Sequence, residues 1–396
     1  MRGIYFAVST FVLATACGGP KTFDFNDSGT DDGGTTDDGS VNPGDSGCPF
    51  CGVDSSSDGT TPACSPNPAN FDIPGNGCDD DGDGVIDNPV GTCDTGLPTA
   101  SPTAAQFAKA IGICPNKGDT WGVTSSSYTQ GIGSNKAPMA QQYGTSATFG
   151  TGVKARQGNV LGILSSGVAA AQDCGTGEFK GNVCSSTGAG VAPPGYPKNA
   201  KINNITCPGS SVANDVVDVV LKIQVPANAK GFSFDFNFYS GEWPEWVCTS
   251  FNDAFVAWLT STAWKGNSGD YNISFDGNKN PVSVNNQFFD VCSPANATVG
   301  CDGSNTLPPD KCSLGNAELK GTGFFVQGDS TCGQQDSGGG ATGWLTTTAP
   351  VAPGETITLQ FMVWNTGDEA FDSSVLLDNW TWIATDTGVT TGRPPN

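Results

Sequence analysis

Apolar and polar residues alternate most clearly in residues 230–258, which read KGFSFDFNFYSGEWPEWVCTSFNDAFVAW. Phenylalanine occupies every second position from Phe232 to Phe238, and polar side chains lie between the rings. A period of two predicts a strand with one buried face. Four aromatic rings on that face predict one wall of a large core, so we expect the rest of the chain to fold around this strand.

Further strands are predicted on both sides of this one. Each is a short run rich in β-branched or aromatic residues that ends at glycine, proline or polar residues. These runs are residues 159–167, 215–225, 254–260, 271–275, 282–284, 355–365 and 374–383. A short helix is expected from residues 101–106 onward, with Pro102 at its first helical position. The pattern predicts an all-β fold, a jelly-roll-like β-sandwich with one short helix and disulfide-rich loops.

The first 17 residues are predicted to be a targeting segment. Arg2 precedes an apolar run at residues 4–13 that is too short to cross a membrane as a helix. The small residues 14–16 then lead into Cys17, an arrangement that resembles the lipobox of bacterial lipoproteins, in which the cysteine carries the lipid. An ordinary signal peptide cut near Ala16 is the alternative. We expect a lipid on Cys17 to attach the protein to the outer membrane or cell surface of a Gram-negative bacterium.

Composition also predicts how the mature chain is divided. Residues 18–74 are rich in Asp, Gly, Ser and Thr, and such a segment cannot bury enough apolar surface to fold, so we expect a low-complexity tether. Residues 75–95 are predicted to form a calcium-loop segment and residues 98–385 the β-sandwich. The polar residues 386–396 are expected to be a frayed tail.

The calcium prediction rests on the spacing of aspartates in residues 75–90. Alternate acidic positions followed by Gly84, where a sharp turn is needed, are typical of oxygen-rich calcium loops. The predicted ligands are Asp79, Asp81, Asp83, Val85 through its carbonyl, and Asp87. Val90 stands where an EF-hand has a glutamate, so the stretch resembles instead the D-x-D-x-D-G loops of thrombospondin type 3 repeats. We expect the ion to make the linker rigid, and an acidic linker without metal is the alternative.

The charge balance and the absence of one residue type exclude several functions. The 396-residue chain has 39 acidic and 17 basic residues, and its net charge of -22 excludes a nucleic-acid partner, which needs a basic surface. The chain has no histidine, which excludes Ser-His and Cys-His catalysis and any zinc site with a histidine ligand. Its 55 glycines and 26 prolines favour a turn-rich β protein.

Cysteine usage fits an exported protein. Of 15 cysteines, 14 remain after Cys17, enough for up to seven disulfides whose pairing the sequence does not give. Cys78 and Cys93 flank the predicted calcium loop, where a bond between them could staple it. The C-x-x-C pair Cys48 and Cys51 lacks the surroundings of a redox or zinc site, so structural disulfides are the better interpretation.

Several ordered pieces of the chain resemble the choice-of-anchor L domain of exported bacterial proteins. They are residues 159–167, 232–243, 252–255, 346–348, 353–356 and 372–376, and together they span roughly residues 100–383. The resemblance implies a surface β domain that different proteins fix to the cell by different anchors and whose biochemical activity is generally unassigned. A departure from the family pattern occurs at Trp243 and Pro244, where a second acidic residue and a tyrosine are common.

Acidic loops next to the strongest predicted strands suggest a second site. Glu242, Asp253 and Asp372 would converge on one calcium ion at one end of the sandwich, or else they only close turns. Trp243 and Trp246 are candidates for stacking on sugar rings, although either ring could instead cover the core.

The sequence thus predicts a lipid-anchored, calcium-stabilised surface protein with a non-catalytic binding or adhesion domain. Its expected partners are the membrane, through the lipid, and a polysaccharide or another surface protein. Two alternatives remain at this point. One is an extracellular carbohydrate-active hydrolase that uses a pair of carboxylates, and the other is a structural component of the envelope.

Overall fold

The computed structural model describes residues 64–88, 91–171, 188–202, 205–244, 246–292, 312–324, 326–329 and 336–394. All of these belong to one unit, Pro62–Asn396. The predicted targeting segment with Cys17, the tether up to residue 63 and the Cys48/Cys51 pair lie outside the described residues. Within the described residues, no helix is long and apolar enough to cross a membrane.

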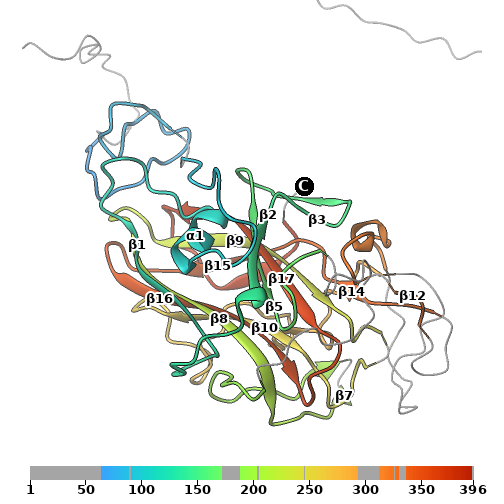
Figure 1. Cartoon of the computed structure of the whole chain (residues 1–396). Helices are drawn as coiled ribbons and strands as arrows, with labels where there is room; N and C mark the ends of the chain where they lie inside the picture. Colours follow the sequence, from blue (N-terminus) through green and yellow to red (C-terminus); the bar gives the residue numbers. More distant parts are fainter. Residues whose placement is uncertain are drawn as a thin grey trace, which may run out of the picture. The chain divides into compact units, whose positions relative to one another are not determined.

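Most described strands belong to two antiparallel sheets (Figure 1). The first sheet has the order β1-β8-β16-β10-β11. Its strands are β1 (Gly122–Thr129), β8 (Ala213–Gln224), β16 (Thr356–Thr366), β10 (Ala254–Thr260) and β11 (Val282–Ser283). The second sheet has the order β18-β15-β9-β17-β5-β2, with β14 also paired to β9. Its strands are β18 (Thr390–Gly392), β15 (Leu345–Pro350), β9 (Gly231–Ser240), β17 (Ser373–Ile383), β5 (Leu161–Ser165), β2 (Tyr143–Ser146) and β14 (Gly340–Ala341).

The main core lies between these two sheets, which makes the fold the predicted all-β sandwich. The four phenylalanines of β9 are fully buried, and they pack against the inward residues of the first sheet. Phe234 meets Phe361 of β16 with ring centroids 5.0 Å apart, and Phe236 meets Phe255 of β10 at 5.0 Å. The alternation along β9 therefore predicted the inner wall correctly, because every second side chain of a strand faces the same side.

Helix α1 (Ala104–Ala110) covers one side of the core, but it begins later than the sequence suggested. Thr103 is its N-cap and accepts a hydrogen bond from the Gln106 backbone N–H in a capping box, so Pro102 lies before the cap instead of inside the helix. The helix buries Phe107 against β5. A Cβ atom added at Gly162 of β5 would lie 2.7 Å from the Phe107 ring, so glycine permits this close approach.

Two further segments differ from the sequence-based prediction. Residues 271–275 form isolated bridges and not the expected strand, because the Asn272 side chain takes over ladder hydrogen bonds from Ala257 and to Ser274. The end of the chain was expected to be frayed, but its residues Thr390–Gly392 form edge strand β18 on β15. Threonine hydroxyls link these two strands, with 2.7 Å between the oxygens of Thr348 and Thr390.

Disulfides tie the irregular segments to the sandwich. The pairs described are Cys64–Cys78, Cys93–Cys114, Cys207–Cys248 and Cys292–Cys312. The idea that Cys78 and Cys93 staple the acidic loop to itself is wrong, because each pairs with a cysteine outside that loop. Residues 64–74, which composition assigned to the tether, therefore belong to the ordered domain.

The remaining elements are short. They are strands β3 (Thr148–Phe149), β4 (Val153–Lys154), β6 (Lys201–Ile202), β7 (Ile205–Thr206), β12 (Val326–Asp329) and β13 (Asp336–Gly338), and the 3-10 helices Ala140–Gln142 and Ala317–Leu319. The three two-stranded pairs β3-β4, β6-β7 and β12-β13 lie apart from the two main sheets. Loops thus make up much of the domain outside the sandwich, as its glycine and proline content suggested.

Candidate functional site

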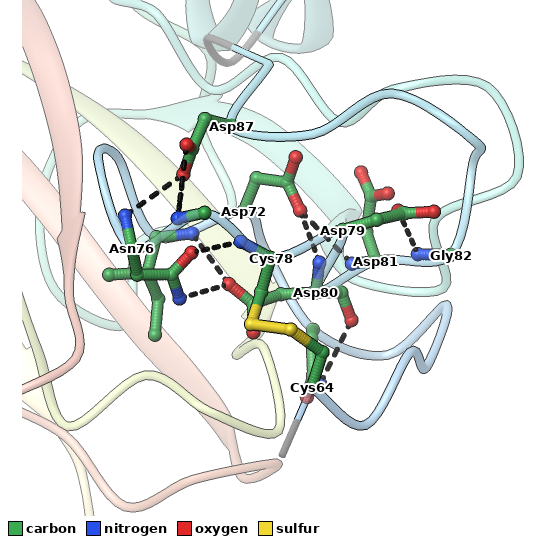
Figure 2. The surroundings of a disulfide bond; sticks show 12 residues. Cys64, Asp72, Asn76, Cys78, Asp79, Asp80, Asp81, Gly82 and Asp87 are labelled. Atoms are coloured by element: carbon green, nitrogen blue, oxygen red, sulfur yellow. Dashed lines mark hydrogen bonds between the residues drawn. A yellow bond between two sulfur atoms is a disulfide. The ribbon is translucent and has the colours of Figure 1, made fainter. Parts of the chain in front are cut away.

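Three aspartates come together in the segment that precedes the sandwich. One carboxylate oxygen from each of Asp72, Asp79 and Asp81 lies within 4.8 Å of the others. Figure 2 shows the three side chains next to the Cys64–Cys78 disulfide. Asp72 and Asp81 are buried and Asp79 is partly exposed, so the group is open to solvent on one side. Three carboxylates at this spacing suit a hard divalent cation such as calcium.

Backbone amides hold this acidic cluster, which we call the junction cluster, in place. The Asp72 carboxylate accepts from the N–H groups of Asp80 and Asp81 at 2.7 and 3.1 Å. The Asp79 carboxylate accepts from Gly82 and Gly84 at 2.8 and 3.0 Å. The repeated glycines of the sequence motif therefore let the loop fold around its own carboxylates.

The other predicted ligands of this loop have different surroundings. Asp83 accepts hydrogen bonds from the Val85 N–H and the Asn88 side chain. Burial raises the pKa of Asp81, and the charges of Asp72 and Asp83 raise it further. Asp87 is turned toward the backbone N–H groups of Asn76 and Gly77 (Figure 2). Val85 is exposed. The structure thus brings Asp79 and Asp81 together with Asp72, which the sequence motif did not contain.

Hydrogen bonds join the segment that carries the junction cluster to the sandwich. The Trp121 indole N–H donates to the Asn70 carbonyl at 2.8 Å, and the Ala227 N–H donates to the Ala69 carbonyl at 2.6 Å. Asp119, which follows the Cys93–Cys114 disulfide, also faces the cluster. Burial, and after it the charges of neighbouring aspartates including Asp81, raise the pKa of Asp119 to about 6. An ion here would therefore join the segment before the sandwich to the sandwich itself.

A second pair of carboxyl groups lies between the two sheets at one end of the sandwich. Glu242 follows β9 and Asp253 precedes β10, and their exposed fractions are 1% and 0%. The Asp253 N–H donates to Glu242 Oε2 at 3.2 Å. Asp253 in turn accepts from the Thr366 N–H and the Ser373 hydroxyl, both at 2.8 Å. We call Glu242 and Asp253 the buried acid pair.

Electrostatics at the buried acid pair disfavours two negative charges. Burial, followed by the charge of Asp253, raises the pKa of Glu242 well above its ordinary value. Burial and the charges of Asp368 and Asp372 raise the pKa of Asp253, although the hydrogen bonds from Thr366 and Ser373 oppose this. Both pKa shifts favour the protonated forms, so the pair disfavours two negative charges unless a cation balances them.

Asp372, the third residue expected at this second site, has other close neighbours. It is buried, its carbonyl accepts from the Gly241 N–H at 3.1 Å, and its side chain packs against Gly167. A Cβ atom at Gly167 would lie 1.9 Å from the Asp372 carboxylate. Asp372 thus influences Asp253 through its charge, while Glu242 and Asp253 share a direct hydrogen bond.

Of the two candidate sugar-stacking tryptophans, Trp243 belongs to the core, and Trp246 packs against two partly exposed rings. Trp243 is 7% exposed and stacks on Phe289 with ring centroids 4.9 Å apart. Trp246 is partly exposed and contacts Phe251 and Phe371 at 5.3 and 6.3 Å. A ring that stacks on a sugar needs one face open to solvent. Trp246 is more exposed than Trp243, so it fits this requirement better.

A cleft of about 430 Å³ lies beside β2, and no residue of the junction cluster or of the buried acid pair lines it. Its walls carry hydroxyl, amide, aromatic and aliphatic side chains and no charged residue. It is lined by residues 99–101, 140–141, 143, 145–146, 163 and 168–171. No local motif in the sequence pointed to this cleft, because its walls come from three separate stretches of chain.

The choice-of-anchor L domain family matches residues 116–381, which is about two thirds of the chain and nearly all of the sandwich. The chain belongs to this family. No curated protein and no solved structure matches the chain. A choice-of-anchor L domain indicates a surface-anchored protein, and the family is not known for enzymatic activity.

Two residues of these sites escaped the sequence analysis. Asp72 lies seven positions before Asp79 and outside the D-x-D-x-D-G motif, so only its proximity in the fold reveals it. Asn365 of β16 directly precedes Thr366, whose N–H donates to Asp253, but a single asparagine at the end of a predicted strand gave no signal. An asparagine next to an inward acidic residue on a neighbouring strand would be the pattern to look for.

Proposed function

We propose that this choice-of-anchor L protein is a lipid-anchored surface receptor whose sandwich binds a neutral polysaccharide without cleaving it. Lipid on Cys17 would hold the chain at the membrane, and residues 18–63 would carry the domain away from it. The cleft beside β2 is the proposed binding site. Calcium at the junction cluster would fix the sandwich to the end of the tether.

The observation that carries this proposal is the uncharged lining of the cleft. The chain has a net charge of -22, yet hydroxyl and amide groups such as Thr145 and Gln141 supply the polar atoms of this site. An acidic protein is expected to repel acidic polymers, while an uncharged cleft with a tyrosine at Tyr143 suits neutral sugars. The shape and chemistry therefore favour a neutral polysaccharide over a charged one.

The position of the carboxylates supports binding over hydrolysis. A glycosidase needs two carboxyl groups that flank a sugar in an accessible site. Glu242 and Asp253 are neighbouring carboxyl groups, but both are buried and neither lines the cleft. The hydrolase alternative is thus disfavoured for this pair.

A substitution in the cleft tests the binding proposal. Ala170 is an exposed lining residue, so Ala170→Trp fills the cleft without disturbing the core. We expect native-gel affinity electrophoresis to show retardation of the oxidised protein by a neutral polysaccharide and loss of that retardation in Ala170→Trp. Ala263→Trp, at an exposed alanine outside the lining, is the matched control and should bind normally.

The outcomes separate the alternatives. Release of new reducing ends from the polysaccharide would favour the hydrolase, and equal retardation of both tryptophan variants would remove the cleft as the binding site. Absence of binding to any neutral polysaccharide would leave a protein ligand or a structural role in the envelope. Independently, Cys17→Ser should move the protein from the membrane fraction to the soluble fraction if the lipid anchor is correct.

Calcium binding at the junction cluster is tested by Asp81→Asn. Asp81 is a buried member of the cluster, and calcium that binds only the folded state raises the melting temperature. We expect calcium to raise the melting temperature of the wild type more than that of Asp81→Asn. Asp386→Asn, which removes an exposed acid elsewhere, should retain the wild-type response.

A further inference from the structure

A cluster of buried polar residues lies at the end of the sandwich where β9, β10 and β16 meet. The ladder pairs Ala254 of β10 with Trp364 of β16, so the preceding Asp253 lies opposite the following Asn365. Ala254 and Trp364 belong to the cluster on the outer face of the first sheet. Since side chains alternate along a strand, Asp253 and Asn365 both point inward, toward the second sheet.

Asn365 is the unusual member of this cluster. It is completely buried, and neither its amide nitrogen nor its amide oxygen has a hydrogen-bond partner. Buried amides are almost always hydrogen-bonded, so an unpaired one beside two carboxyl groups needs an explanation. A cation coordinated by the amide oxygen would supply the missing partner of that oxygen.

The carboxyl groups beside Asn365 also retain unused bonding capacity. Each Asp253 oxygen accepts one hydrogen bond, and Glu242 Oε2 accepts one from the Asp253 N–H. A carboxylate oxygen has two lone pairs, so room for further coordination remains. None of the ion pairs formed by described residues involves Glu242 or Asp253.

We propose that Glu242, Asp253 and the amide oxygen of Asn365 form a second calcium site, buried between the two sheets. Carboxylate and amide oxygens are the ligands that calcium prefers, and the ion would balance charges that are otherwise buried. Glu242 follows β9 of the second sheet, while Asp253 precedes β10 and Asn365 lies in β16 of the first sheet. The ion would therefore link the two sheets at this end of the sandwich. This site goes beyond the binding function and does not depend on the cleft or on the junction cluster.

The site is tested in the full mature chain by calcium titration calorimetry and by sensitised terbium luminescence. Asp79→Asn/Asp81→Asn removes the junction cluster, and we call it the junction-off variant. We expect the wild type to bind two calcium ions, the junction-off variant one, and junction-off with Glu242→Gln none. Terbium in the junction-off variant should emit when tryptophan is excited, because Trp243 and Trp364 adjoin the proposed ligands.

Further substitutions separate a metal ligand from a packing residue. Asn365→Asp adds a charge at the same shape and should tighten calcium binding by roughly tenfold or more, whereas Asn365→Leu should abolish binding at this site. Asp378→Asn is the matched control, because Asp378 is a buried carboxyl group on β17 that bonds the Arg156 N–H instead. It should leave the single ion of the junction-off variant in place.

Each result has a definite meaning. A junction-off variant that binds no calcium or terbium overturns the proposal, and so does residual binding that Glu242→Gln leaves unchanged. In either case the two carboxyl groups share a proton instead of a metal ion. A wild type and a junction-off variant that both bind one ion would support this buried site and refute the junction cluster.

Discussion

Replacement of Asp218 by asparagine should stabilise the protein, and the gain should depend on pH. Asp218 lies in the middle of β8 and has no exposed surface. Its Oδ2 accepts from the Thr129 hydroxyl at 2.9 Å and from the Gln360 amide at 2.7 Å, while Oδ1 has no partner. Burial outweighs these two hydrogen bonds and raises the pKa of Asp218 from 3.8 to about 7.

The sign and size of the effect follow from linkage. Between pH 3.8 and about 7 the folded protein retains the Asp218 proton that the unfolded chain has lost, so this group lowers stability as the pH rises. A tenfold change in acidity corresponds to about 1.4 kcal/mol, so the full displacement corresponds to about 4 kcal/mol. Asparagine does not titrate and keeps an oxygen for both donors. We therefore expect Asp218→Asn to be more stable than the wild type by about 2–4 kcal/mol at about pH 8, and by less than about 1 kcal/mol near pH 4.

Urea unfolding of the oxidised protein, followed by tryptophan fluorescence across this pH range, measures the difference. Other buried acids titrate in the same range, so only the difference between variant and wild type isolates Asp218. Asp386→Asn is the control, since Asp386 is exposed and its contact with Lys230 should contribute less than about 1 kcal/mol at any pH. A wild type that is more stable than Asp218→Asn at about pH 8, or a difference that does not change with pH, would refute the reasoning.

Three other substitutions test the packing of the sandwich. Phe236→Ala should lower the free energy of unfolding by about 3–5 kcal/mol in urea titration, because Phe236 is fully buried between the sheets. Gly162→Ala should cost about 1–3 kcal/mol, since the new methyl group would collide with Phe107, and a stable variant would show that α1 can move. Cys207→Ala/Cys248→Ala removes a disulfide between residues 41 positions apart. It should lower the free energy of unfolding by about 4 kcal/mol, because the unfolded chain gains entropy. An unchanged melting temperature would show that the folded chain alone fixes that loop.

Local patterns predicted the strands of the sandwich well. The alternation at residues 231–240 and the β-branched run in β8 identified one strand in each of the two main sheets. The strand predicted at residues 271–275 was wrong, because the Asn272 side chain replaces a backbone partner there. The frayed tail was wrong as well, because residues 390–392 pair with β15 as edge strand β18. Those outcomes depend on which neighbour a segment meets, and composition carries no information about the neighbour.

The candidate sites were only partly predictable for the same reason. The spacing of Asp79 and Asp81 pointed to the junction cluster, but Asp72 joins it through the turn that the Cys64–Cys78 bond closes. Glu242 and Asp253 were expected in acidic loops at one end of the sandwich, and the structure buries both and joins them by a hydrogen bond. The sequence named the residues, and the fold decided whether solvent reaches them.

By itself, the sequence determined the all-β class, the central strand and the family, because these depend on periodicity and order along the chain. It also supplied the prediction of an exported, lipid-anchored protein. Only the tertiary structure decided the disulfide pairs, the uncharged cleft and the environment of each acidic group. Thr366 and Asp253 are 113 residues apart in the chain and 2.8 Å apart in the fold. Contacts of that kind set the burial and the pKa of a carboxyl group, since both depend on everything that surrounds it.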